Sequence, residues 1–278
     1  MKQTIQDIKQ MGAKVWAEQN LDKIEYIKGL IVKCATAYYE GTALITDADF
    51  ECFVDVIKSV NPNDEILTIP GWGYKITNGS KHLYGKIGSL PYYFDYDELK
   101  NNFQNNSQII ITPKFDGINF VAYFDEGKFD KCLTRGNGYV GKDISWAFKN
   151  YSLPDELKQK SFAINGEAIC YMSTDLNINF RDTVAEYLNN ESNIKNNNIE
   201  FMPFNLLNLR LNNYLDTINL INKFSKIKIR FKLLNNLPTE KELKNIFDEY
   251  SKAFKIDGLV ITENKTKKQI AFKYRELI

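Results

Sequence analysis

The sequence contains little histidine, cysteine and proline, and each scarcity removes a class of protein. Its 278 residues include one His, four Cys and seven Pro. A single histidine excludes a multi-histidine metal site, and a Ser-His-Asp triad has only His82 to use. The cysteines form no CxxC pair, so neither a zinc finger nor a disulfide scaffold is expected; they are Cys34, Cys52, Cys132 and Cys170.

An excess of charge of one sign is also lacking. Lys and Arg number 36 and Asp and Glu 35, which leaves a net charge of +1. Bulk charge therefore does not hold this protein to nucleic acid, and any basic surface must be local. No apolar run approaches the length of a membrane span, and the N-terminal stretch MKQTIQDIKQMGAKVWAEQ has no apolar core like that of a signal peptide. We therefore expect an intracellular, cytoplasmic globular protein without a membrane partner.

The N-terminal part of the chain is predicted to be helical. Residues 3 to about 60 carry apolar side chains at helical spacing, as in IEYIKGLIVKC. Thr46 precedes the amphipathic segment DADFECFVDVIKSV and is the predicted N-cap of that helix, with acidic residues in its first turn. The turn Asn61-Pro62-Asn63-Asp64 ends it. These boundaries predict a small helical domain over residues 1–66.

Residues 67–278 are predicted to form a second domain of short strands, turns and a few helices. The hairpin NFVAYFDEGKFDKCLTR closes at Glu126-Gly127, and the segment from Asn189 to Asn198 is a predicted solvated loop. Helices are expected at DISWAFKNYSL and PTEKELKNIFDEYSKAF. Strands are expected at IIITPKFDG, SFAINGEAICYM, KFSKIKIRFKLL, KIDGLVI and QIAFKY. This order of elements indicates an α+β fold with mostly antiparallel pairing.

A glycine-rich stretch matches the dinucleotide-binding pattern GxGxxG, at Gly136, Gly138 and Gly141. The strand before it is the second arm of a hairpin and carries Lys128 and Asp130, whereas the first strand of a dinucleotide fold is buried on both faces. No apolar strand ending in an acid follows at the expected distance. We therefore expect these glycines to form a turn that approaches a ligand closely.

Five short elements follow one another in order along the second part of the chain. They are Lys114-Phe-Asp116-Gly117, Thr134-Arg135-Gly136, Gly166-Glu167, Asp257-Gly258 and Ala271-Phe272-Lys273. KxDG alone occurs often by chance, but the ordered set resembles the covalent nucleotidyltransferases, the superfamily of polynucleotide ligases and capping enzymes. The resemblance implies a nucleotidyltransferase domain, ATP-grasp-like with mostly antiparallel sheets, after the small helical domain.

Within that superfamily the sequence most resembles the adenylation module of NAD-dependent DNA ligases. The stretch KFDGINFVAYFDEGKFDKCLTRGNGYVGKDI resembles the family's KxDG-to-TRGDGxxGED block without a gap, and IAFKY resembles its IAFKF element. AYYEGTALITDADFECF resembles the family's AYYxxDxPxISDAEYDRL with one residue deleted. In the family this helical segment binds the nicotinamide mononucleotide (NMN) half of NAD, and ATP-using relatives lack it.

The resemblance implies the chemistry of a DNA ligase that uses NAD and Mg²⁺. Lys114 attacks the α-phosphate of NAD, which gives lysyl-AMP and releases NMN; the AMP then passes to the 5′-phosphate of a nick in duplex DNA. A free lysine with a pKa near 10.4 is neutral only about one time in a thousand at pH 7.4, so it needs cations or burial to lose its proton. Lys273 and a bound Mg²⁺ supply that field and neutralise the phosphate.

The resemblance also assigns roles to individual residues. The catalytic set is Lys114, Asp116, Arg135, Glu167, Asp257 and Lys273, with Asp116 and Asp257 as candidate metal ligands. The adenosine side comprises Ser89, Leu90, Thr112, Lys114, Arg135, Glu167, Phe204 and Lys273. The NMN side comprises Tyr38, Tyr39, Asp47, Phe50 and Glu51. Contacts to nucleic-acid phosphates fall to Arg181, Lys265 and Lys267, the last two because they are near Lys273 in the sequence.

Several positions depart from the family pattern. Thr112 stands where the family usually has the glutamate that reads adenine, and Thr262 stands where it has a lysine. Both changes fall in the adenine-reading region, so adenine is expected to be held more by backbone and stacking. Phe50 and Glu51 replace a tyrosine and an aspartate, which keeps shape and charge but loses one hydroxyl. The Thr-Pro-Lys of the first motif resembles motif I of some viral ATP-dependent ligases, which favours a viral or phage origin.

Three hypotheses stay open on the sequence alone. Full-length ligases of the family continue beyond the element that contains Lys273 with an OB-fold, a zinc module and helix-hairpin-helix repeats, whereas this chain ends five residues after it. We therefore expect self-adenylation without zinc, and poor sealing unless an OB-fold second subunit or missing C-terminal domain takes part. The alternatives are an ATP-dependent or RNA-joining ligase of the same fold, and a catalytically silent nucleotide-binding homologue.

Overall fold

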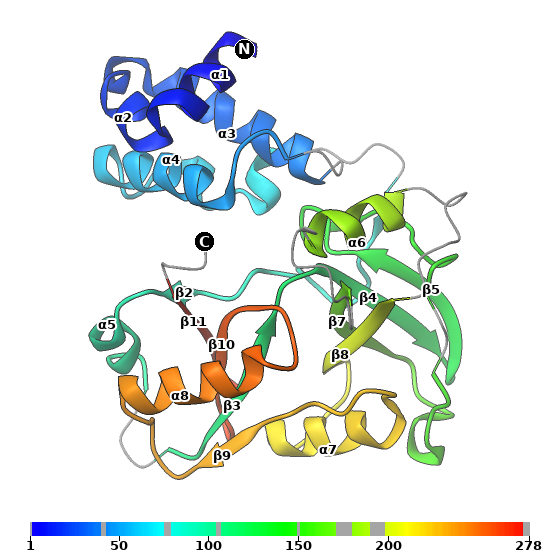
Figure 1. Cartoon of the computed structure of the whole chain (residues 1–278). Coiled ribbons are helices and arrows are strands. Elements are labelled where there is room, and N and C mark those ends of the chain that lie inside the picture. Colours follow the sequence, from blue (N-terminus) through cyan, green and yellow to red (C-terminus); the bar gives the residue numbers. More distant parts are fainter. Residues whose placement is uncertain are drawn as a thin grey trace. The chain divides into compact units, whose positions relative to one another are not determined.

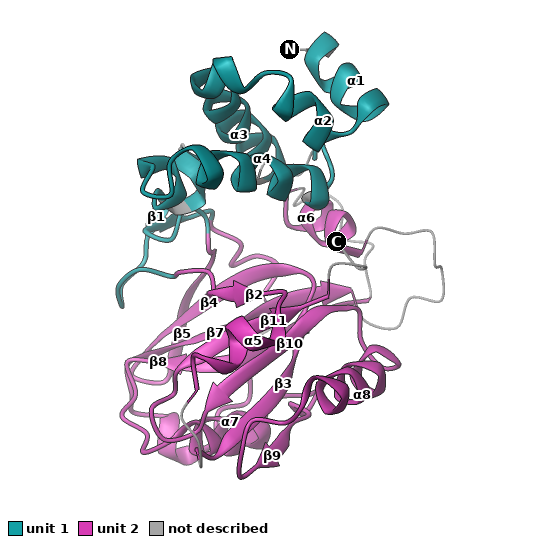
Figure 2. Cartoon of the chain, turned by 90° about the vertical axis from the view of Figure 1, so that its left-hand side faces the viewer, with its two compact units in different colours: residues 1–87, 136–142, 278 teal, residues 88–135, 143–277 magenta. Residues whose placement is uncertain are grey.

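The chain folds into two compact units (Figure 2). The computed structural model describes residues 2–39, 43–74, 79–103, 107–148, 151–170, 180–189 and 198–274. The first unit holds residues 1–87 with 136–142, and the second holds residues 88–135 with 143–277. The predicted domain boundary at residue 66 therefore lies inside the first unit, and it stays a prediction. Within this unit β1 (Ser80–Lys81) pairs antiparallel with β6 (Val140–Gly141).

Four helices build most of the first unit (Figure 1). They are α1 (Lys2–Met11), α2 (Ala13–Glu18), α3 (Ile24–Tyr39) and α4 (Asp47–Val60), and short 3₁₀ turns lie at Leu21–Lys23, Glu65–Leu67 and Pro70–Gly73. The apolar side chains that give the helical spacing meet in one core, where Ile27, Phe53 and Ile57 are fully buried. The predicted N-cap is confirmed. Thr46 Oγ1 accepts a hydrogen bond from the Asp49 backbone N–H, and the Asp49 carboxylate accepts one from the Thr46 N–H.

Two sheets form the centre of the second unit. The five-stranded sheet has the order β2-β11-β10-β3-β9 and the four-stranded sheet has the order β5-β4-β7-β8. Their strands are β2 (Tyr92–Tyr93), β3 (Ile109–Phe115), β4 (Ile118–Asp125), β5 (Lys128–Thr134), β7 (Phe162–Cys170), β8 (Ile199–Leu207), β9 (Lys232–Leu234), β10 (Ile256–Glu263) and β11 (Gln269–Lys273). All neighbours in these sheets pair antiparallel except β11 with β2, so the mostly antiparallel α+β prediction is confirmed.

Helices pack against the strands of both sheets. They are α5 (Tyr96–Lys100), α6 (Phe180–Asn189), α7 (Tyr214–Phe224) and α8 (Glu240–Ser251), with a 3₁₀ turn at Asp155–Leu157. Leu243 and Tyr250 of α8 share a core with Ile109 and Ile111 of β3, and Tyr250 also donates a hydrogen bond to the Ile111 carbonyl. Thr239 begins α8 with a second capping box, so the predicted helix PTEKELKNIFDEYSKAF is confirmed.

Two segments differ from prediction in their described part. DISWAFKNYSL, predicted as a helix, forms turns instead, because Ser145 Oγ accepts from the Cys132 N–H and Asp143 accepts from the Ser145 N–H. Its apolar residues at helical spacing are buried all the same. In KFSKIKIRFKLL, α7 extends to Phe224 and only Lys232–Leu234 pairs as a strand. The loop predicted for residues 189–198 lies outside the described residues except at its two ends.

The glycine-rich stretch after β5 forms a turn, as predicted. Gly136 and Gly138 adopt φ of 55° and 88° in it. Among the described helices, none combines the length and the apolar character that crossing a bilayer requires.

Candidate functional site

Two lysines share one carboxylate at the end of the five-stranded sheet. Lys114 Nζ lies 2.9 Å from Asp257 Oδ1 and 2.8 Å from Oδ2, and Lys273 Nζ lies 3.2 Å from Oδ2. The strand order explains this arrangement, since β10 lies between β3 and β11. Gly258 of β10 pairs with Lys114 on one side and Lys273 on the other. Three predicted catalytic residues therefore meet.

A β-bulge places Asp257 on this face. Strand residues alternate between faces, so a regular β10 would direct Asp257 away from the side that carries Lys114. Ile256 pairs with Phe115 and Gly258 with Lys114, which leaves Asp257 as an extra residue in β10. Bulges of this kind re-aim a side chain. Gly258 has no room for a side chain, because a Cβ there would lie 2.3 Å from the Phe272 carbonyl oxygen.

The two ammonium groups decide the charge of Asp257. Burial acts to raise the pKa of this carboxyl, but attraction to Lys114 and Lys273 and their hydrogen bonds outweigh it, so the pKa lies below its usual value. Asp257 is therefore a carboxylate at neutral pH. Its charge holds two cations near one point, where they would otherwise repel each other.

Glu167 lies on the four-stranded sheet as a second acid of the site. Burial raises the pKa of Glu167 to about 7; Lys114 and Arg135 act in the opposite direction, and Asp257 and Asp116 add to the rise. Gly117 permits this packing, since a Cβ there would lie 2.1 Å from the Ala168 carbonyl oxygen. Glu167 can therefore exist in either protonation state near neutral pH.

Neutralising Glu167 is expected to make stability less dependent on pH. Between the ordinary value of 4.5 and the folded value of about 7, the native protein keeps a proton that the unfolded chain has lost, so stability falls as the pH rises. Above pH 7 the buried charge costs on the order of 3 kcal/mol. Glu167→Gln should therefore raise the thermal midpoint relative to wild type at pH 8 and change it little at pH 4.5.

A carboxyl outside the site provides the control for this experiment. Glu186 is exposed on α6, so Glu186→Gln should shift the midpoint by a similar small amount at both pH values. If Glu167→Gln changes the midpoint equally at pH 4.5 and pH 8, burial of a charge at this position is not what links stability to pH.

Two arginines complete the polar side of the site. Arg135 Nη1 donates to Ser89 Oγ over 2.8 Å. Arg181, in the first turn of α6, has Nη1 3.6 Å from Asp116 Oδ1. Burial lowers the pKa of Arg181 to about 10, against the attraction of Asp257, and this still leaves it a cation at neutral pH. Arg181 therefore lies beside Asp116 of the predicted catalytic set, and Arg135 of the same set contacts Ser89.

Among the predicted adenosine residues, Thr112 lies on the same face as the two lysines, whereas Phe204 belongs to the four-stranded sheet and Leu90 lies outside both sheets. Thr112 lies on β3, one alternate position from Lys114, and is 5% exposed; Thr262 on β10 is fully buried and diagonally adjacent to it. Phe204 is the extra residue of a bulge in β8, and its carbonyl accepts from the Tyr214 hydroxyl. Leu90 follows Ser89 and is partly buried. The two departures from the family pattern are therefore neighbours in space.

The described residues offer no complete metal cage. Among them, no three carboxyl, imidazole or thiol groups gather closely enough to hold a metal ion. Magnesium seldom needs such a cage, because it keeps several waters and binds one or two carboxylates together with substrate phosphates. Asp116, which pairs with Arg181, and Asp257, whose two oxygens accept from Lys114, are the carboxylates predicted for such a site.

The predicted NMN residues belong to the first unit. Tyr38 is in the last turn of α3, while Phe50 and Glu51 are in the first half of α4, and all three are partly buried. The backbones of Tyr39 and Asp47 belong to these helices, but their side chains lie outside what the structure describes. Phe50 packs edge-on against Trp72, with ring centroids 5.4 Å apart.

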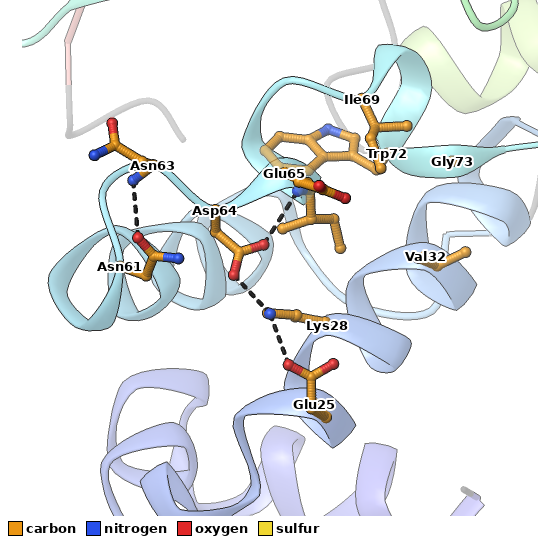
Figure 3. Close-up of a pocket in the computed structure, with 11 residues that line it drawn as sticks. Glu25, Lys28, Val32, Asn61, Asn63, Asp64, Glu65, Ile69, Trp72 and Gly73 are labelled. Atoms are coloured by element: carbon orange, nitrogen blue, oxygen red, sulfur yellow. Dashed lines mark hydrogen bonds and ion pairs between the residues drawn. The ribbon is translucent and has the colours of Figure 1, made fainter.

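A pocket of about 370 Å³ lies elsewhere in the first unit (Figure 3). Lys28 crosses it and bridges two acids, with Nζ 2.7 Å from Glu25 Oε1 and 2.6 Å from Asp64 Oδ2. Its hydrogen bond lowers the pKa of Asp64. Trp72, which Phe50 contacts, forms part of the apolar wall; the three predicted NMN residues with described side chains, Tyr38, Phe50 and Glu51, are not in the lining. Lys28 and the two acids pair with one another, and the ion pair between Lys28 and Asp64 links α3 to the segment after α4.

Lys265 and Lys267 do not join the lysine cluster. They lie in the turn between β10 and β11, at the opposite end of that hairpin from Lys273. Lys267 donates to the Leu211 carbonyl over 2.7 Å. Proximity in the sequence therefore does not bring them close to Lys273, because a hairpin separates its turn from its open end by the length of its strands. Their contact with nucleic-acid phosphates stays a prediction.

One residue of this site was missed from the sequence. Asn119 of β4 pairs with Glu167 across the sheet, and its Nδ2 donates to Asn165 Oδ1 and to the Gly166 carbonyl. Its Oδ1 is buried without a hydrogen-bond partner. The sequence feature that could have indicated Asn119 is its polar amide in an otherwise apolar predicted strand, two residues after the KFDG motif.

The sequence is similar to known proteins along most of its length. Residues 87–276 match the model of the family described as the NAD-dependent DNA ligase adenylation domain. A protein of Invertebrate iridescent virus 6 named Putative DNA ligase 205R is 27% identical over 293 aligned residues, which cover 92% of this chain and 45% of that protein. The DNA ligase of Borreliella burgdorferi strain ZS7 is 34% identical over 148 residues, 49% of this chain and 22% of its own.

The chain spans less than half the length of both relatives. Solved structures similar to it include an archaeal ATP-dependent RNA ligase, with a TM-score of 0.47, 12% identity and coverage of 68% of this chain and 48% of that one. The RNA ligase of Naegleria gruberi has a TM-score of 0.42 and 14% identity, and the match covers 80% of this chain and 69% of that one.

Proposed function

Because this chain belongs to the family of NAD-dependent DNA ligase adenylation domains, we propose that it transfers AMP from NAD to Lys114. Lys114 Nζ attacks the α-phosphorus of NAD. A P–N bond forms, the P–O bond to NMN breaks and the amine loses a proton, so the products are lysyl-AMP and free NMN. The AMP then passes to the 5′-phosphate of a nick in duplex DNA. The observation that carries this proposal is the pair Lys114 and Lys273 held on Asp257.

The ion cluster prepares the reacting groups before NAD enters. Asp257 fixes the position of the Lys114 amine through two hydrogen bonds, so little reorganisation is needed at the moment of attack. Lys273 lies on the same carboxylate and is placed to stabilise charge on the phosphate in the transition state. Mg²⁺ bound with the phosphates, and held by Asp116, would supply further positive charge there.

The four-stranded sheet is proposed to hold the ribose. Glu167 and the unpartnered Oδ1 of Asn119 are both acceptors, and ribose hydroxyls are donors. A hydroxyl at this place would complete the bonding of Asn119, whose buried oxygen otherwise stays unsatisfied at a cost of about 1–3 kcal/mol. Arg135, anchored on Ser89, is proposed to help hold the ribose or to orient the nick.

The helical domain predicted over residues 1–66 is proposed to bind the NMN half of NAD. Tyr38, Tyr39, Asp47, Phe50 and Glu51 supply aromatic surface and carboxylates, which suit a cationic nicotinamide ring. Residues 67–278 would then form the nucleotidyltransferase domain of the prediction. The support is sequence resemblance together with the helices α3 and α4, which carry these residues.

Nicked duplex DNA is the proposed substrate of the steps that follow the transfer of AMP to Lys114. The protein is proposed to act inside the cell. Arg181, Lys265 and Lys267 are the proposed phosphate contacts, of which Arg181 lies beside Asp116. The related proteins are more than twice as long as this chain, so we propose that efficient sealing needs an OB-fold on a further domain or on a partner. The similarity to a viral protein supports a viral or phage origin.

The donor is tested by the mass of the protein after incubation with each nucleotide. With NAD and Mg²⁺, intact-mass spectrometry should show a gain of one AMP and the release of NMN, whereas ATP and Mg²⁺ should give no adduct. The reason is that the NMN-binding segment recognises a group that ATP does not have.

Two other results would contradict the donor proposal in different ways. An adduct from ATP and none from NAD would make the chain an ATP-dependent ligase of the same fold. Binding of NAD, shown by calorimetry, without any adduct would make it a silent nucleotide-binding homologue. Sealing of nicked DNA at full speed by the purified chain alone would remove the need for an OB-fold partner.

A further inference from the structure

We infer that this chain does not distinguish a 6-amino from a 6-oxo purine in its nucleotide donor. The inference rests on the proposed function, and it adds a substrate: nicotinamide hypoxanthine dinucleotide, the 6-oxo analogue of NAD. The observation behind it is the set of side chains that continues from the two lysines along the inner face of β3, β10 and β11.

Strand register arranges that face in three rows. The first row is Lys114, Gly258 and Lys273; the second is Thr112, Val260 and Ala271; the third is Ile110, Thr262 and Gln269. Alternate residues of a strand share a face and rise about 7 Å per pair, so each row lies that far beyond the previous one. With the α-phosphate at the lysines, the second and third rows lie where a nucleoside extends from it.

Solvent reaches the second row at its middle residue. Val260 is partly exposed, although Leu259 and Ile261, its neighbours on the opposite face of the same central strand, are fully buried. Thr112 and Ala271 beside it have small side chains and are themselves buried. The accessible part of this row is therefore Val260, two residues along β10 from Gly258, which lies between the two lysines.

The polar groups of these two rows are all neutral. Gln269 Nε2 donates to Thr262 Oγ1 over 3.2 Å, and Gln269 also hydrogen-bonds with the Tyr214 hydroxyl. Tyr214 in turn donates to the carbonyl of Phe204 across the site. Among the described residues of these two rows, none carries a formal charge.

Neutral hydroxyl and amide groups adapt to either base. The 6-amino group of adenine donates a hydrogen bond and its N1 accepts, whereas the 6-oxo group of hypoxanthine accepts and its N1–H donates. A threonine hydroxyl both donates and accepts, and a glutamine side chain carries both kinds of group. A carboxylate only accepts and would reject the oxo group. Thr112 can therefore meet either edge by rotating its hydroxyl, and Gln269 can do so by exchanging its bonds to Thr262 and Tyr214.

The chemical step is unchanged by the base. Lys114 Nζ attacks the α-phosphorus of the hypoxanthine dinucleotide, a P–N bond forms, the P–O bond to NMN breaks and the amine gives up a proton. The products are lysyl-IMP and NMN. Atoms and charges balance as they do with NAD, and no additional reactant is needed.

The test compares the two donors in separate single-turnover reactions with the full chain and Mg²⁺. Adduct formation is followed by intact mass, and the site is identified by peptide mapping. The expected rates differ by less than about tenfold, whereas a site built to hydrogen-bond one edge rejects the other by about 10⁴-fold. Thr112→Glu should create a preference for NAD of about 100-fold or more. Gln269→Glu serves as a second variant at a less buried position, and Thr68→Glu, exposed in the first unit, should leave the ratio unchanged.

The outcomes separate the two proposals. If NAD gives an adduct and the hypoxanthine dinucleotide reacts more than about 100-fold slower, the inference is wrong while the proposed function stands. If both carboxylate variants fold, by circular dichroism, and keep the wild-type ratio, these rows do not read the base and the inference is again wrong. If neither donor gives an adduct, the proposed function fails and the inference fails with it.

Discussion

Lys114→Ala is expected to abolish transfer of AMP from NAD, with a loss of about 10⁴-fold or more. Lys114 is the nucleophile of the proposed reaction, and alanine offers no atom that can form the P–N bond. Lys273 is bound to the same carboxylate, but its Nζ contacts only one oxygen of Asp257 and comes from the opposite neighbouring strand. A second lysine nearby therefore does not replace the first. The measurement is intact mass after incubation with NAD and Mg²⁺.

The matched control is a lysine on the other sheet. Lys128 is exposed at the start of β5, so Lys128→Ala should keep the wild-type adduct and rate. Lys114→Arg keeps the positive charge and should also give no adduct, which separates the loss of a nucleophile from the loss of a cation. An adduct of normal yield on Lys114→Ala, mapped by peptide analysis to another lysine, would disprove the assignment.

The parts of the fold that were predicted correctly depend on signals within a few residues. Thr46 and Thr239 begin helices through bonds to backbone groups three residues away, and such pairs are visible as S/T-x-x-D/E in the sequence. The hairpin at Glu126-Gly127 is equally local, since both residues adopt a positive φ. Local chemistry decides these features whatever the rest of the chain does.

The errors came from interactions that the local pattern does not contain. Ile144, Ala147 and Phe148 have helical spacing, yet Ser145 bonds to the neighbouring strand β5 and the segment turns instead. Lys265 is near Lys273 in sequence but at the other end of a hairpin. The first error depends on the bond between Ser145 and strand β5, and the second depends on the length of β10 and β11. The spacing of apolar side chains along the sequence contains neither kind of information.

The candidate site shows the same division. Motif order was enough to select Lys114, Asp257 and Lys273, but it could not show that a bulge turns Asp257 toward the two lysines. Nor could it show that Asn119 lies opposite Glu167, because that depends on the register of β4 with β7. Residue identity indicated the chemistry, and strand register decided which groups meet.

Asp257→Asn is the second large effect we expect, a fall of about 10²- to 10³-fold in the rate of AMP transfer. Asparagine has nearly the same shape, so the bulge and the sheet should persist. It removes a full negative charge, because the pKa of Asp257 lies below its usual value and the carboxylate is ionised at the pH of the reaction. Lys114 and Lys273 then repel each other without a shared anion, and the Lys114 amine keeps at most one of the two bonds that aim it, because the amide nitrogen of asparagine cannot accept.

Single-turnover adduct formation at saturating NAD measures this effect without the contribution of DNA binding. Asp130 provides a close control, since it is the extra residue of another bulge, in β5, and its carboxylate is half exposed. Asp130→Asn should change the rate by less than about twofold, as expected for a weak surface pair. If Asp257→Asn keeps more than a tenth of the wild-type rate with normal affinity for NAD, then the charge of this carboxylate does not organise the lysines. The bulge in β10 would in that case serve the fold alone, and the position of Lys114 would have to come from its own strand.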